Sequence, residues 1–202
     1  MMRRWLVVLA SLLLAACFTS GRRGADGAMA VYDLGPLASR PVTERRSLGL
    51  ALDVRAPLWF DAQGINYRLA YAEPARLREY ARARWAGPPA QLIQQRLIQD
   101  LALVPAGQSR TLCLLRLDID EFSQVFATPT ASRGVLQGRV QWLDRSRTSL
   151  AERQVKIDQL AASNDSPGGV AALAMAVGEL ARQIEAWQNE LIAAGRLRSC
   201  RP

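Results

Sequence analysis

The chain of 202 residues contains no histidine and only one lysine, Lys156. Without histidine it cannot form a Ser-His-Asp or Cys-His catalytic site, an imidazole-ligated zinc site or a histidine general base. The sequence also has no GxGxxG and no GxxxxGK[ST] phosphate-binding loop, which argues against a nucleotide-dependent enzyme. These absences favour a non-enzymatic protein, and we expect it to hold no metal ion and no other cofactor.

The only long hydrophobic run lies at the N-terminus and is too short to span a bilayer. Two arginines precede an almost unbroken apolar run over residues 5–14, and two alanines separate this run from Cys17. A membrane-spanning helix needs about 20 apolar residues. The order of basic, apolar and small residues is typical of an export signal. The sequence therefore predicts a cleaved signal peptide over residues 1–16.

The end of this segment, Leu14-Ala15-Ala16-Cys17, resembles the lipobox of bacterial lipoproteins. The resemblance implies that the Cys17 thiol receives diacylglycerol, that cleavage occurs before Cys17, and that its new amine is acylated. The alternatives are an ordinary secretory signal that ends in cysteine, or a buried N-terminal helix. Several acyl chains would anchor the protein permanently, since each buried CH₂ contributes about 0.8 kcal/mol. Residues 17–30, which include three glycines and lack an apolar period, would form a flexible lipidated tether.

The formal net charge is +8, and the basic residues are nearly all arginine. They are scattered singly or in pairs, without a platform of aromatic residues between them. This distribution does not favour a nucleic-acid partner, which usually requires a clustered basic surface. An anionic membrane surface is the more natural counter-charge, and Arg22 and Arg23, just behind the predicted anchor, suit that role.

Two further cysteines, Cys113 and Cys200, are separated by most of the C-terminal half of the chain. Exported proteins fold in an oxidising compartment, where disulfides persist. Cys113 shares the apolar face of a predicted strand, and Cys200 follows the last predicted helix, whose end can return to that strand. We expect a disulfide, which would close a loop of about 88 residues and stabilise the fold by about 4.6 kcal/mol. The alternative is one buried and one exposed free thiol.

The periodicity of apolar residues predicts an α/β (α+β) sandwich, a mixed, mostly antiparallel sheet with two main helices on one side. Residues 31–202 would form this single domain, and residues 77–85 fit either a helix or a strand. One helix begins at Pro88-Pro89, and the other begins after Asp165 or Ser166 and ends at Gly195. The predicted strands are residues 31–34, 48–54, 65–71, 111–125, 135–144 and 150–160.

A carboxylate-rich strand is the best candidate for catalysis. Asp118 and Asp120 would share one strand face about 7 Å apart, a spacing that carboxylate pairs can use in hydrolysis, and Glu121 follows them. Arg116 lies on the same face, so the pattern favours a solvated face with an internal ion pair over the site of an envelope hydrolase.

The pair Trp59 and Phe60 follows Pro57 in a predicted loop. Large aromatic residues in a loop either fold back into the core or remain exposed. If both side chains are exposed, they form a patch that contacts a protein partner. We expect Trp85, by contrast, to be structural and to fill the junction between the sheet and the first helix.

Several short motifs resemble those of the ABC-type transport auxiliary lipoproteins, the PqiC-like or YmbA-like proteins. The most specific is Arg84-Trp85-Ala86-Gly87-Pro88-Pro89 before a helix, although acidic residues are common in relatives where this chain has Ala86-Gly87. The resemblance covers nearly the whole chain after Cys17. The other motifs are the lipobox, Tyr32-x-Leu34, Val54-x-x-Pro57, Ile65-x-Tyr67-Arg68 and the stretch from Leu117-Asp118-Ile119 to Phe122.

The resemblance implies a non-enzymatic periplasmic domain that works beside an inner-membrane ABC transporter carrying an MCE-domain protein, in lipid movement across the envelope. It also implies a fold like that of the TolB N-terminal domain, and some relatives form homo-oligomeric rings. Phe18 follows the lipidated cysteine, where an Asp would retain enterobacterial lipoproteins in the inner membrane. The implied location is the periplasmic face of the outer membrane, with the inner membrane as the alternative. A structural lipoprotein unrelated to transport remains open.

The anchor can be tested by replacing Cys17 with Ser. We expect the variant to remain unprocessed or to be released from membranes, because it has no thiol for lipid attachment. Fractionation at high salt and mass spectrometry of the N-terminus measure the two effects. A variant that carries no lipid and still fractionates with membranes would contradict the lipoprotein interpretation.

Overall fold

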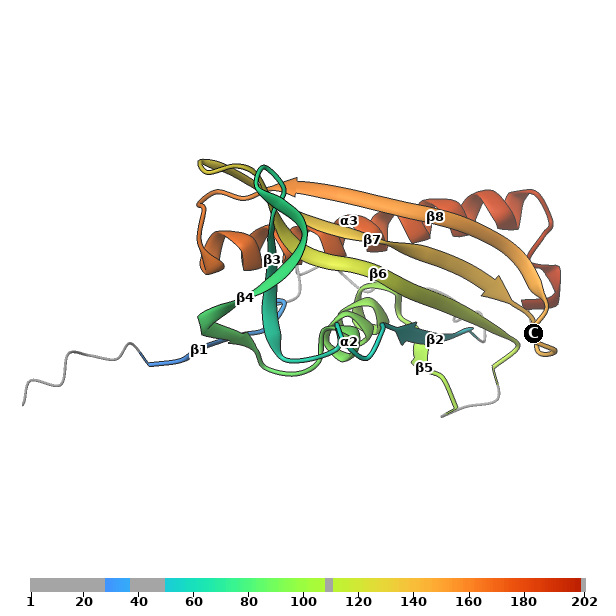
Figure 1. Cartoon of the computed structure of the whole chain (residues 1–202). Helices are drawn as coiled ribbons and strands as arrows, with labels where there is room; N and C mark the ends of the chain where they lie inside the picture. The colour runs from blue at the N-terminus through green and yellow to red at the C-terminus, as the bar shows by residue number, and fades with distance from the viewer. Residues whose placement is uncertain (1–27, 37–49, 108–110, 201–202) are drawn as a thin grey trace, which may run out of the picture.

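The computed structural model describes residues 28–36, 50–107 and 111–200. The predicted signal peptide, Cys17 and most of the predicted tether lie outside these residues. Figure 1 shows an elongated sheet with a long helix behind it. The elements are β1 (Ala30–Tyr32), β2 (Leu50–Arg55), β3 (Gly64–Leu69), β4 (Glu73–Trp85), α2 (Pro89–Leu101), β5 (Val104–Pro105), β6 (Cys113–Thr128), β7 (Ala131–Leu143), β8 (Ser149–Leu160), α3 (Ser166–Ala193) and the 3₁₀ turn η2 (Arg198–Cys200).

The predicted mixed sheet with two main helices is confirmed. The longest ladders are antiparallel and join β6 to β7 and β7 to β8, and β3 and β4 form an antiparallel hairpin. The N-terminal half of the chain adds parallel pairings of β1 with β4, β2 with β5, and both β2 and β3 with β6. The ambiguous residues 77–85 belong to strand β4, and β1 begins at Ala30, one residue before the predicted domain boundary.

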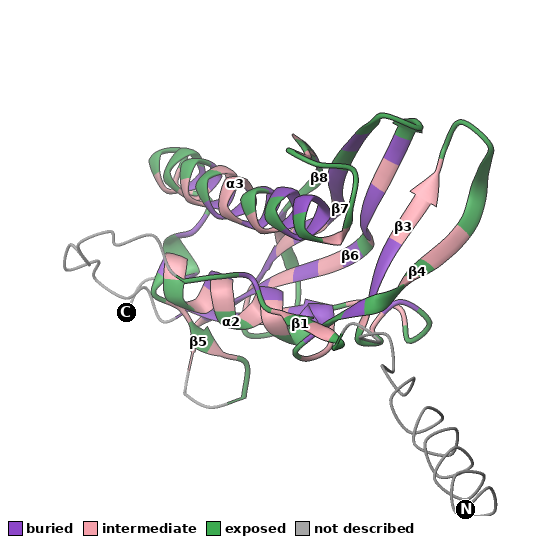
Figure 2. Ribbon diagram, turned by 90° about the vertical axis from the view of Figure 1, so that its left-hand side faces the viewer, coloured by how far each residue is buried: buried purple, intermediate pink, exposed green. Residues whose placement is uncertain are grey.

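Both helices cover the same face of the sheet, and the core lies between them and the strands (Figure 2). The opposite face carries charged and polar side chains from β2, β6, β7 and β8. No helix of the described residues is both long and apolar enough to cross a membrane. The buried stripe of α2 is Ile93, Leu97 and Leu101, and that of α3 includes Val170, Leu173, Val177, Leu180 and Ile184.

The two helix starts follow the signals in the sequence. Pro89 opens α2, where its missing N–H costs nothing, and the N–H of Ala90 donates to the carboxylate of Asp61 at 3.1 Å. Trp85 is buried and stacks on Phe122 with ring centroids 5.7 Å apart, so its predicted place at the sheet-to-helix junction is confirmed. Asp165 is the N-cap of α3 and accepts a 2.9 Å hydrogen bond from a backbone N–H.

Strand β6 changes its buried face halfway along its length. Its odd-numbered residues from Cys113 to Ile119 pack against the helices, as predicted, but the next buried aromatic is the even-numbered Phe122. The pairing with β7 shifts between Ile119 and Glu121, which is a β-bulge, and the extra residue reverses the alternation of faces. A Cβ on Gly138 of β7 would collide with the carbonyl oxygen of Asp118, so glycine accommodates the bulge.

The structure joins Cys113 and Cys200 in a disulfide, with Cα atoms 5.2 Å apart, a separation that disulfides span. Both cysteines are buried. The bond ties the first residue of β6 to the turn η2 that follows α3. It therefore connects the sheet layer to the end of the helix layer.

Two glycines provide a matched test of this packing. A Cβ on Gly134 of β7 would lie 2.7 Å from backbone atoms of α3, whereas a Cβ on Gly178, in the middle of α3, would meet nothing within 4 Å. We expect Gly134→Ala to lower the free energy of unfolding by about 1–3 kcal/mol through overpacking. Gly178→Ala should raise it by about 1 kcal/mol, because alanine favours the helix. Urea unfolding measures both, and changes of the same sign would contradict the packing described.

Candidate interaction surfaces

The segment that joins β2 to β3, residues 56–63, carries two adjacent exposed apolar side chains, one of which is the most exposed large apolar side chain of the described residues. Leu58 is 95% exposed and Trp59 is 62% exposed, whereas Phe60 is fully buried in the core. Of the two alternatives that the sequence left open for this pair, Phe60 follows the first and folds back into the core, whereas Trp59 follows the second and remains exposed. We call Leu58 and Trp59 the tip.

The tip is held by an ordered turn. The N–H groups of Phe60 and Asp61 both donate to the carbonyl of Pro57, at 2.9 and 3.1 Å. The Trp59 ring meets the Phe60 ring edge to face, with centroids 5.6 Å apart. Because Phe60 is anchored in the core and Asp61 accepts a hydrogen bond from the first turn of α2, the two tip side chains project from a fixed base.

Exposed arginines lie at the two ends of the loop that carries the tip. Arg55 ends β2 and pairs with Asp53 at 2.8 Å, and Arg84 of β4 is the register partner of Gly64, the first residue of β3. Between Arg55 and Gly64 the only charged residue is Asp61, which is engaged at the start of α2. The tip itself is thus uncharged, and the exposed arginines lie at the strand ends that bound its loop.

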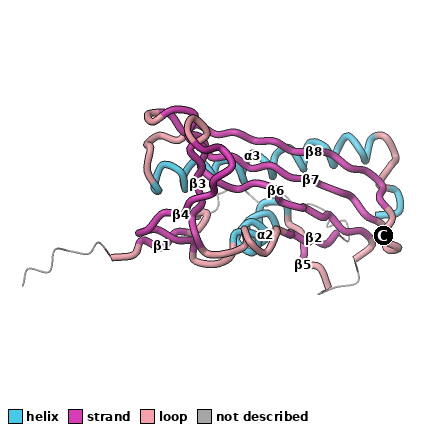
Figure 3. The backbone as a smooth tube through the Cα atoms, viewed as in Figure 1, coloured by secondary structure: helices cyan, strands magenta, loops and turns pink. Residues whose placement is uncertain are grey.

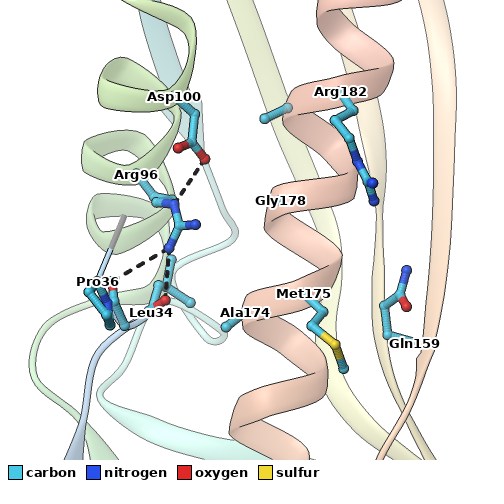
Figure 4. A pocket seen from close by; sticks show the side chains of 11 residues that line it. Leu34, Pro36, Arg96, Asp100, Gln159, Ala174, Met175, Gly178 and Arg182 are labelled. Carbon is cyan, nitrogen blue, oxygen red and sulfur yellow. Dashed lines mark hydrogen bonds and ion pairs between the residues drawn. The ribbon is translucent and has the colours of Figure 1, made fainter. Parts of the chain in front are cut away.

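A second surface, the α3 groove, lies over the outer side of α3. It consists of two adjoining hollows of about 500 and 430 Å³ that share Leu34, Gly35 and Ala174. Figure 4 shows Arg96 and Asp100 of α2 on one side of α3, and Met175 and Arg182 on the side toward Gln159 of β8. The Arg96 guanidinium pairs with Asp100 at 2.9 Å and donates to the carbonyl of Leu34 at 3.0 Å.

Two of the three candidate carboxylates pair with arginines of neighbouring strands. Asp118 lies 3.7 Å from Arg139 of β7, and Arg116 lies 3.6 Å from Asp53 of β2, so the predicted ion pair within β6 is replaced by pairs between strands. The bulge separates Asp120 from the regular alternation. Glu121 pairs with Arg68 at 3.0 Å. Within residues 28–36, 50–107 and 111–200, no cluster of three or more His, Cys, Asp or Glu could hold a metal ion.

A hydrogen-bonded chain of polar side chains, buried at Gln124 and Ser132, connects three strands beside the start of α3 and was not predicted. Tyr80 donates to the amide oxygen of Gln124 at 2.8 Å, the Gln124 amide donates to Ser132 at 2.8 Å, and Ser132 donates to Asn164 at 2.9 Å. Burial, together with the neighbouring Tyr67 and Asp165, raises the pKa of Tyr80 to about 12, so its hydroxyl stays a neutral donor. The chain is satisfied internally and therefore has a structural role.

The strand tube in Figure 3 shows the 56–63 segment leaving the sheet between β2 and β3. Sequence reasoning missed Leu58 as the most exposed of these residues. Its signal was present: an apolar run, residues 56–60, that begins where the strand alternation ends and contains Pro57. Proline fixes a turn at such a position, and a turn that buries one large side chain leaves its neighbours outside.

Alanine substitutions separate the anchoring and the exposed aromatic residue. Phe60→Ala should lower the free energy of unfolding by about 3–5 kcal/mol, because it opens a cavity in the core. Trp59→Ala should change it by no more than about 0.5 kcal/mol, as for an exposed side chain. Chemical unfolding followed by circular dichroism measures both. Equal losses would show that the tip is part of the core.

Solved structures and a family model both match the chain. One match is a protein from Xanthomonas campestris of the DUF330 family, with a TM-score of 0.62 and 19% identity, which covers 69% of this chain and 81% of that protein. Another is an uncharacterized protein with a TM-score of 0.60 and 17% identity, and the match covers 78% of this chain and 96% of that protein. Both likenesses concern the fold, and no curated protein matches. The family model of the ABC-type transport auxiliary lipoprotein component matches residues 32–185, and the chain belongs to this family.

Proposed function

We propose that the protein is a lipid-anchored periplasmic accessory component of an MCE-type ABC transport system, that it acts without catalysis, and that it assists lipid movement across the envelope. The observation that carries this proposal is the family match over residues 32–185, which spans the sheet and both helices. Because the family consists of auxiliary components of ABC-type transport, we infer that an ABC transporter is the partner of this protein. The MCE partner and the lipid substrate are the finer parts of the proposal.

The side-chain chemistry of the described residues supports a non-catalytic role. Two of the three carboxylates that the sequence offered for hydrolysis are engaged in ion pairs across strands, namely Asp118 with Arg139 and Glu121 with Arg68. A catalytic pair requires one carboxyl to donate a proton while the other stays ionised. Asp118 and Glu121 are instead committed to ion pairs that join neighbouring strands, which supports a structural role for both side chains.

The covalent length of the N-terminal segment limits where the domain can work. Ala28 lies eleven positions after Cys17, and even a fully extended segment of that length spans at most about 40 Å. If Cys17 is anchored in the outer membrane, as the lipobox and Phe18 imply, the domain stays close to that membrane. The subunit of the transport system that it contacts must then extend across the periplasm, and we propose that the MCE-domain protein is this subunit.

Capture in intact cells tests the partner. The full-length protein, tagged after Pro202 and expressed from its own promoter, should crosslink to an MCE-domain protein encoded beside a transporter permease and ATPase. An equally abundant tagged lipoprotein of another family is the matched control and should not capture that protein. Repeated capture of other envelope proteins without any transporter subunit would overturn the proposal and favour a structural lipoprotein.

A further inference from the structure

The tip has the composition of a bilayer contact. Leu58 and Trp59 are exposed apolar side chains on an ordered turn, and the loop that carries them runs from the exposed Arg55 to Gly64, whose register partner is the exposed Arg84. Tryptophan is enriched at membrane interfaces, where its ring lies at headgroup level. Arginine side chains beside an inserted apolar group are attracted to anionic lipid headgroups. We propose that the tip inserts into the anionic phospholipid surface in which Cys17 is anchored, and so fixes the orientation of the domain on that surface.

The root of the tether and the base of the tip meet at the same two residues. The N–H of Ala86 donates to the carbonyl of Tyr32, at the end of β1, and the N–H of Trp85 donates to the carbonyl of Gln63, at the end of the loop, both at 2.7 Å. Ala28 lies four residues before Tyr32, and Trp59 lies four residues before Gln63. Because the segment from Cys17 to Ala28 spans up to about 40 Å, the anchor leaves the tip free to reach the bilayer.

The size of the tip favours a lipid surface over a protein partner. A stable protein interface buries about 800 Å² on each partner, from about 20–30 residues, whereas the tip consists of two side chains. A bilayer needs no matching surface. Since the anchor already holds the domain beside the membrane, the tip binds at a high effective concentration, and a contact that would be too weak for a free protein then suffices.

The turn keeps the entropic cost of insertion low. Phe60 is fully buried, Asp61 contacts the first turn of α2, and both N–H groups of the turn are bonded to Pro57. Ordering a flexible loop upon binding would reduce the affinity. In this protein the loop is already ordered by its contacts with the folded domain, so insertion does not carry that cost.

The proposal rests on the anchor at Cys17, and tryptophan fluorescence tests it separately from the transporter partner. Among the described residues Trp59 is exposed, whereas Trp85, Trp142 and Trp187 are buried. The full-length mature protein, with its lipidation verified by mass spectrometry, is reconstituted into phosphatidylethanolamine–phosphatidylglycerol vesicles with and without brominated acyl chains. Bromine quenches the emission of an indole that it touches. We expect loss of most of the Trp59 emission, defined as the difference between wild type and Trp59→Phe.

A matched control places tryptophan at the other end of β3. Tyr71, an exposed residue of the β3–β4 hairpin, is changed to Trp in the Trp59→Phe protein and should keep its emission. Leu58→Asp should remove the quenching of Trp59 without unfolding the domain. If Trp59 keeps its emission in vesicle-bound protein, or if both positions are quenched equally, the proposal is overturned. It is also overturned if Trp59 becomes shielded only when a transporter protein is added, because the tip would then be a protein contact.

Discussion

The β-bulge in β6 is the constraint on which the rest of the fold depends. One edge of β6 is shared by two strands in succession, since β2 pairs with it as far as Asp118 and β3 pairs with it from Gln124. The bulge lies between these two pairings. It lets one 16-residue strand present odd-numbered side chains to the core beside β2 and even-numbered ones beside β3. Glycine at position 138 is the condition for it.

The division of β6 also determines where the tip forms. The chain must leave the sheet after Arg55 and return at Gly64, because the bulged part of β6 between the two pairings accepts neither strand. A connection that leaves a sheet must satisfy its own backbone groups. Here the N–H groups of Phe60 and Asp61 donate to the carbonyl of Pro57, and the carbonyl of Gln63 accepts from the N–H of Trp85. The exposed apolar point is therefore a consequence of how β2 and β3 share one edge.

The approach of α3 to the sheet is set by small residues on both sides of the contact. A side chain on Gly134 would meet the helix backbone, and one on Gly169 would meet the Gln124 amide. The Gln124 amide belongs to the polar chain that runs from Tyr80 to Asn164. Close packing at one end of α3 is thus combined with a hydrogen-bonded network that specifies the register of strands and helix. The outer side of the helix carries the small residues Ala174 and Gly178, and these residues form the floor of the α3 groove.

The elements that sequence reasoning predicted well were those in which local pattern and tertiary role agree. Strands β7 and β8 and helix α3 keep one periodicity over their whole length, and their ends carry turn or capping residues such as Asp165. Strand β4 was ambiguous because alternating alanine and arginine suit a helix by propensity, and only its pairing with β3 and β1 decides the matter.

The remaining features depend on contacts that a single sequence does not reveal. The bulge is hidden in the sequence because Asp120 continues an apparent alternation of apolar and polar residues. The nearby Asp118 and Glu121 pair with arginines of β7 and β3, which the sequence does not reveal either. Parallel pairing of β2 and β3 with β6 joins residues more than 50 positions apart. Trp59 and Phe60 are neighbours of similar character, so composition could not determine which of the two enters the core.

The disulfide divides the fold into two parts that differ in their response to mechanical load. Residues 113–200 form a covalent ring that contains β6, β7, β8 and α3, whereas β1 to β5 and α2 lie outside it. The tether enters through β1, an edge strand held by three residue pairs to β4. A pull between the membrane anchor and a partner that holds the ring would therefore peel β1 away before the ring is strained. The domain would yield at β1, where the tether enters, while the strands of the ring and α3 stay intact.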